Sequence, residues 1–72
     1  MKKNTYAYHK PSQQSLNVIR SLRRAFHELN EKILYMAPDS RERSTAITQL
    51  ETAAMWAIKA IVINDPESVV EE

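Results

Sequence analysis

Residues 38–61 read PDSRERSTAITQLETAAMWAIKAI, and this run begins with the signals of a helix start. Pro38 cannot continue a preceding helix, and the carboxylate of Asp39 can accept hydrogen bonds from the free backbone N–H groups that follow it. Glu42 comes three residues after Asp39 and can complete a capping box. The sequence therefore predicts a helix that begins at this point.

The apolar residues of this helix recur every three or four positions, which places them in one stripe that must be buried. The stripe consists of Ile47, Leu50, Ala54, Ala57, Ile58 and Ile61. Four more large apolar residues lie off it, and these are Met55, Trp56, Val62 and Ile63. Two helices have nothing to cover these side chains with, so we expect further copies of the chain to cover them. Trp56 is interpreted as a core or interface anchor.

A second periodic run precedes Pro38 and consists of Leu16, Ile19, Leu22, Phe26, Leu29, Ile33 and Met36. It predicts a helix from about Ser12, a plausible N-cap, to Met36, roughly 35 Å long. The connection at residues 37–39 is too short for anything except an antiparallel return. The second helix is expected to end near Ile63, before Asn64-Asp65-Pro66. The predicted fold class is all-α, with a long antiparallel αα-hairpin.

The two ends of the chain lie outside this hairpin. Residues 1–11 are expected to form an extended or short helical arm, and a solvated, disordered terminus is an equal alternative. Residues 1–64 are interpreted as one helical-hairpin domain that includes this arm. Residues 65–72 are interpreted as an acidic C-terminal tail, whose Val69 and Val70 could dock.

The composition excludes several classes of protein. A chain of 72 residues buries only about 60% of its unfolded surface, so we expect it to be stabilised by assembly into a homo-oligomer. It has no cysteine and two histidines, which excludes a disulfide and a structural metal site made by the chain alone. No cofactor is expected. The net charge of +1 gives no general attraction to DNA, RNA or a membrane surface.

The N-terminal residues do not resemble a secretory signal, because Met1-Lys2-Lys3 is followed by polar residues rather than by an apolar core. No apolar run approaches the ~20 residues that a membrane span needs. We therefore expect a soluble protein that remains in the cytoplasm where it is made.

Basic residues are concentrated in the N-terminal half, where six lie between Lys2 and Arg24 with no acidic residue among them. Helical spacing places Arg20, Arg24 and His27 on one face, with Arg23 at its edge. One interpretation is a solvated face that pairs with Glu28 and Glu31. The other is a site for an anion, because three arginines within five positions repel one another unless something neutralises them.

The start of the second helix is another candidate anion site, because free N–H groups and the helix dipole favour negative charge there. Arg41, Arg43 and Thr45 lie at this start, and a capped helix with solvated arginines is the alternative. The sequence has no glycine, which excludes Gly-rich phosphate loops. No constellation of nucleophile and base is present, so we do not expect an enzyme. Tyrosine rings such as that of Tyr8 can stack on a nucleobase.

Several segments together resemble one known family. They are Tyr8-His9-Lys10-Pro11, Leu22-Arg23, Pro38-Asp39-Ser40-Arg41-Glu42, Leu50-Glu51 and Met55-Trp56-Ala57. The pattern is similar to that of small phage proteins that share the anti-CBASS and Thoeris anti-defence hairpin domain, and it covers about residues 6–64. Ile58 departs from the family pattern, which usually has asparagine at that position.

The resemblance implies a sponge, which is a protein that sequesters the cyclic oligonucleotide messengers of bacterial immunity without cleaving them. It implies a homohexamer in the cytoplasm of the infected host, with cyclic dinucleotides between paired protomers and cyclic trinucleotides at separate sites. Carried over to this sequence, Tyr8 is the candidate for base stacking and Arg23 for phosphate binding. Lys10, Arg20, Arg24 and His27 are further candidates for this site. Arg41, Arg43 and Thr45 are candidates for a second ligand site.

Two other functions are open at this point. The chain could be a non-enzymatic oligomerisation or adaptor module that binds a protein partner through Trp56, Met55 and Ile63. It could also bind a nucleic acid polymer through Arg20, Arg23 and Arg24, although the near-zero net charge argues against this.

Overall fold

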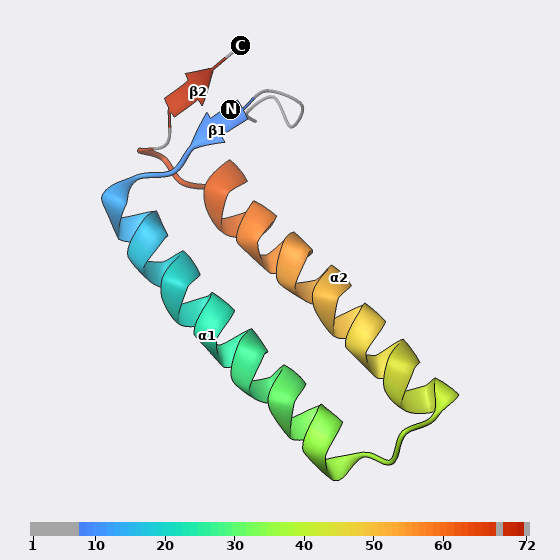
Figure 1. Cartoon of the computed structure of the whole chain (residues 1–72). Coiled ribbons are helices and arrows are strands. Elements are labelled where there is room, and N and C mark those ends of the chain that lie inside the picture. The colour runs from blue at the N-terminus through green and yellow to red at the C-terminus, as the bar shows by residue number, and fades with distance from the viewer. Residues whose placement is uncertain (1–7, 68, 72) are drawn as a thin grey trace.

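The computed structural model describes residues 8–67 and 69–71, and it describes side chains for residues 10–67. Two antiparallel helices, α1 (Gln13–Met36) and α2 (Arg41–Ile63), form a hairpin (Figure 1). Two short strands, β1 (Tyr8–Lys10) and β2 (Val69–Glu71), pair at the end opposite the helical connection. The predicted αα-hairpin is therefore confirmed.

The capping residues explain where α1 begins and ends. Ser12 is the N-cap, and its hydroxyl accepts a hydrogen bond from the backbone N–H of Ser15 at 3.2 Å. At the other end, the N–H of Ala37 donates to the carbonyl of Ile33 at 2.9 Å. Ala37 itself is extended, as expected for a residue that precedes a proline. The predicted cap at Ser12 and the predicted end at Met36 are both confirmed.

The start of α2 differs by one residue from the prediction. Ser40, not Asp39, is the N-cap, and its hydroxyl accepts a hydrogen bond from the N–H of Arg43 at 3.1 Å. The third position after this cap is then Arg43 rather than Glu42, so the predicted capping box does not form. Asp39 instead forms an ion pair with Arg43.

The two helices bury little between them. All six stripe residues of α2 are half-buried against α1, and Ile19 of α1, with 3% of its surface exposed, is the one fully buried apolar residue in the described part of the chain. Two residues of the predicted α1 stripe, Leu29 and Met36, are 46% and 75% exposed. They lie roughly 80 to 100° around α1 from Ile19, because each residue turns the helix by about 100°. These two members of the predicted stripe therefore lie away from the side of α1 that packs on α2.

The exposed apolar surface of α2 is also large. By length and composition alone the 23 residues of α2 could cross a bilayer, and no residue of its apolar stretch is fully buried in the single chain. Crossing would place Glu51 and Lys59 in hydrocarbon, where a charged side chain costs about 3 kcal/mol. If other protein chains cover the apolar surface of α2, its apolar composition is explained without placing these charges in hydrocarbon.

A buried carboxylate closes the open end of the hairpin. Asp65 follows α2, and its Oδ2 atom accepts hydrogen bonds from the backbone N–H of Ser12 at 3.1 Å and from the hydroxyls of Ser12 and Ser15, each at 2.6 Å. Its Oδ1 atom accepts from the N–H of Glu67 at 2.9 Å. Asp65 is 7% exposed. We call this group the Asp65 cluster, and it joins the first turn of α1 to the chain that leaves α2.

The strands lie directly beyond this cluster. They are antiparallel, with Tyr8 opposite Glu71, His9 opposite Val70 and Lys10 opposite Val69. The described part of the N-terminal arm is therefore extended rather than helical, and residues 69–71 dock on it. Residues 1–7 of the expected arm lie outside the described residues.

The Asp65 cluster predicts a specific dependence of stability on pH. The two serine hydroxyls and the backbone N–H groups stabilise the ionised carboxylate, which lowers the pKa of Asp65 far below its ordinary value. The resulting stabilisation is complete above the ordinary pKa of about 4 and is lost as the pH falls toward the lowered value. Thermal unfolding followed by circular dichroism should show Asp65→Asn to be less stable than the wild type at pH 7, with the difference shrinking toward pH 2.

Asp39→Asn is the matched control, because the Asp39 side chain is 89% exposed and its ion pair is worth little. Its melting temperature should stay close to that of the wild type across the pH range. A deficit of Asp65→Asn that stays the same from pH 7 to pH 2 would show that the carboxylate charge is not the stabilising feature.

Candidate ligand-binding surface

The basic residues of α1 form one exposed face. Arg20, Arg23, Arg24 and His27 are all exposed, and helical spacing places Arg20, Arg24 and His27 together with Arg23 at the edge nearer α2. They lie about 10 to 20 Å along α1 from Gln13, which places them around the middle of the helix. The structure thus brings these four predicted site residues onto one surface, which we call the basic face.

The arginines of the basic face have no acidic partners among the described side chains. Among the side chains at residues 10–67, no carboxylate lies within ion-pair distance of Arg20, Arg23 or Arg24, and Glu28 and Glu31 do not pair with them. Among these side chains the face is exposed to solvent, but its expected pairing with Glu28 and Glu31 is absent. Three planar guanidinium groups remain available for the paired hydrogen bonds that phosphate oxygens accept.

The N-terminal strand lies just before the start of α1 (Figure 1), and the basic face begins about 10 Å further along that helix. Lys10 is exposed at the end of β1, three residues before α1 begins. Tyr8 is the first residue of β1, and its side chain lies outside the described side chains. The backbone of β1 therefore places Tyr8 and Lys10 near the start of the helix that carries the arginines.

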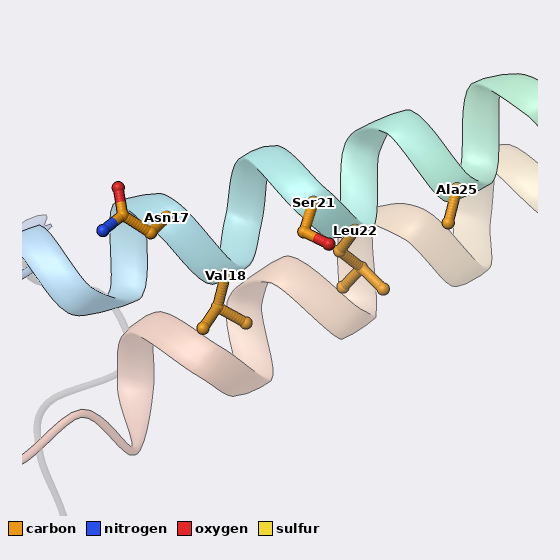
Figure 2. A pocket seen from close by; sticks show the side chains of 5 residues that line it. All are labelled: Asn17, Val18, Ser21, Leu22 and Ala25. Atoms are coloured by element: carbon orange, nitrogen blue, oxygen red, sulfur yellow. The ribbon is translucent and has the colours of Figure 1, made fainter.

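An apolar groove occupies a different side of α1. Figure 2 shows its five lining residues, Asn17, Val18, Ser21, Leu22 and Ala25, and its volume is about 400 Å³. A second hollow of about 310 Å³ follows on the same helix and is lined by Leu29, Lys32, Ile33, Met36 and Ala37. Apolar hollows suit contacts with another protein surface better than contacts with phosphates.

Sequence reasoning missed this groove because it sought a single stripe on α1. Val18, Leu22, Ala25 and Leu29 also recur at spacings of four, three and four, which is the signal of a second, adjacent apolar stripe. Val18 is 47% exposed in the single chain. The helix therefore has a side packed on α2, an unburied apolar side and the basic face.

The start of α2 is already engaged with the rest of the hairpin. The guanidinium of Arg43 donates to the carbonyls of Leu34 at 3.2 Å and Ala37 at 3.4 Å, and it pairs with Asp39 at 3.1 Å. The hydroxyl of Thr45 donates to the carbonyl of Arg41 at 3.0 Å. Arg43 therefore satisfies backbone carbonyls at the end of α1, a role that the sequence analysis did not foresee. Arg41 is exposed.

Comparison with known proteins gives one match. The family model described as the Acb2/Tad1 hairpin domain matches residues 1–62 of this chain. No curated protein and no solved structure matches. The matched residues include β1, the basic face and the start of α2, and they end before Asp65 and β2.

The contacts of Arg43 predict that this side chain stabilises the helical connection. Arg43→Ala should lower the free energy of unfolding by roughly 1 kcal/mol, because it leaves carbonyls of Leu34 and Ala37 without their guanidinium donor. Urea unfolding of Arg43→Ala and of Arg41→Ala, an exposed neighbour with the same charge, measures the difference. Equal stability of the two variants would contradict a structural role for Arg43.

Proposed function

Because the chain belongs to the Acb2/Tad1 hairpin domain family, whose members are non-enzymatic anti-defence sponges, we propose that it sequesters cyclic oligonucleotide messengers. Binding without cleavage keeps the messenger from CBASS effectors in the cytoplasm of the infected host. The observation that carries this proposal is the basic face, whose arginines are exposed, clustered and without acidic partners among the described side chains.

Cyclic dinucleotides are the proposed primary ligands. Each carries two negatively charged phosphates and two bases, so a binding site needs cations for the phosphates and aromatic rings for the bases. Arg23 is the proposed phosphate contact and Tyr8 the proposed base-stacking residue. Lys10, Arg20, Arg24 and His27 can supplement the charge, because they lie on the same strand or the same helix face.

We further propose that the protein acts as a homo-oligomer, with a hexamer as the expected form. The described part of a single chain fully buries only Ile19 among its apolar residues, whereas Met55, Trp56 and Met36 are 64 to 75% exposed. Contact with other copies would remove this apolar surface from water. A two-fold interface between copies also matches the approximate two-fold symmetry of a cyclic dinucleotide, because each copy supplies the same pair of residues.

A second ligand site for cyclic trinucleotides is proposed at the start of α2. Arg41 is exposed there and makes no side-chain hydrogen bond or ion pair among the described residues. Arg43 and Thr45 could contribute only by exchanging their present partners for the ligand. Arg41 is therefore the residue of this group that supports the proposal most directly.

Loss of either proposed contact should weaken dinucleotide binding. Arg23→Ala removes a charge-assisted phosphate contact and Tyr8→Ala removes base stacking, so each should raise the dissociation constant roughly tenfold or more. Isothermal titration calorimetry with cyclic di-AMP, cyclic di-GMP and cyclic GMP-AMP measures the change. Chromatography of the ligand recovered after denaturation should return it intact.

Lys32→Ala is the control, because it removes an exposed cation of α1 from outside the basic face. Its affinity should match that of the wild type. Unchanged affinity in both Arg23→Ala and Tyr8→Ala would place the pocket elsewhere, and a cleaved ligand would make the protein an enzyme.

The exposed apolar residues predict how assembly responds to mutation. Trp56 is 64% exposed and lies within cation–π distance of Lys59, 5.4 Å from the ring centroid, so its ring is not a core anchor of the single chain. If the ring packs against another copy, Trp56→Ala should lower the oligomer mass or make it depend on concentration while helix content is retained. Light scattering after size exclusion measures this.

Thr52→Ala is the matched control, because it truncates an exposed side chain of α2 one turn away. It should leave the oligomer mass unchanged. A stable wild-type monomer at working concentration would contradict the proposed homo-oligomer. It would favour the alternative function, an adaptor that binds a different protein through Trp56.

A further inference from the structure

β1 is only three residues long, so contacts with other parts of the chain must hold it in place. A two-stranded ribbon is at best marginally stable in water on its own. In the described part of the chain, β1 contacts β2 and the end of α2. The segment that carries Tyr8 and Lys10 is therefore held by the C-terminal end of the chain rather than by α1.

The Asp65 cluster fixes the points from which both strands start. Ser12, which gives Asp65 its backbone N–H and its hydroxyl, comes two residues after Lys10. Asp65 itself comes four residues before Val69, and its bond to the N–H of Glu67 turns the chain toward β2. Both strands thus lie within a few residues of the Asp65 cluster along the chain, and Figure 1 shows them side by side.

The charge of the C-terminal segment argues against direct contact with the ligand. Residues 65–72 carry four acidic residues and no basic one, so they repel a phosphate. Their pairing with β1 is a backbone interaction that does not need the charges. The C-terminal segment can therefore affect an anion site without touching the ligand, by holding β1 in place.

We propose that β2, anchored through the Asp65 cluster, is a positioning element that holds β1, with Tyr8 and Lys10, beside the start of the helix that carries the basic face and thereby sets the affinity for cyclic dinucleotides. This inference rests on the function proposed above and adds to it a role for the C-terminal segment. The segment lies beyond residue 62, where the family match ends. A strand that is already in place does not have to be ordered when the ligand binds, which strengthens binding.

The main test breaks the strand pairing in the full-length chain. Val70→Pro removes a backbone N–H from the middle of β2, and Val70→Thr is the matched control because it keeps a β-branched residue and the N–H. Val70→Pro should raise the dissociation constant for cyclic di-AMP, cyclic di-GMP or cyclic GMP-AMP roughly tenfold. Oligomer mass and melting temperature should match those of Val70→Thr.

A double-mutant cycle separates positioning from a general structural effect. If β2 acts by holding Tyr8, Val70→Pro should weaken binding much less in a Tyr8→Ala background than in the wild type. A full and additive loss in that background would overturn the proposal, as would an unchanged or tighter affinity of Val70→Pro. Glu71→Gln tests the charge, and it should bind at least as tightly as the wild type.

Hydrogen exchange provides a readout that needs no ligand. Amides of residues 8–10 should exchange faster in Val70→Pro than in Val70→Thr, while those of α1 and α2 stay the same. Equal exchange in β1 would overturn the positioning role. If the wild type binds none of the three dinucleotides but β1 exchange still rises, the proposed ligand class fails and the structural coupling between the two ends of the chain stands.

Discussion

A pair of helices can bury only one side of each, and this constraint governs the whole molecule. Ile19 is the only apolar residue that becomes fully buried in the described part of the chain. The hairpin is therefore also held at its two ends by polar contacts. Asp65 joins the first turn of α1 to the chain after α2, and Arg43 joins the last turn of α1 to the start of α2. Each contact uses an ionised side chain and the polar groups that a helix end leaves unsatisfied.

The same constraint leaves two chemically distinct surfaces on α1. One is apolar and includes Val18, Leu29 and Met36, and the other carries the three arginines, which have no acidic partner in the described part of the chain. An apolar surface lowers its free energy by contact with another protein chain, whereas clustered guanidinium groups lower theirs by binding an anion. A single helix can therefore take part in both assembly and ligand capture, with the side packed on α2 between the two.

Much of the candidate site follows from spacing along the sequence. Arg20, Arg24 and His27 share a face because the α-helix repeats every 3.6 residues, and α1 was predictable from its periodicity and from Ser12. The absence of ion pairs to Glu28 and Glu31 was not predictable, since both pairings satisfy the usual spacing. No signal in the sequence distinguished a role of Arg43 in the connection from a role in anion binding, because either role needs a cation near a helix start.

The sequence by itself determined the two helices, their bounds to within one residue and their antiparallel return, because caps, prolines and periodicity act over a few neighbouring residues. Only the tertiary structure decided which residues far apart in the sequence contact each other. These contacts include the hydrogen bond from Ser15 to Asp65 and the pairing of β1 with β2. It also decided which apolar residues remain exposed. These features depend on how the two helices meet in space, and no local pattern along the chain encodes the partner of a lone aspartate or of a three-residue strand.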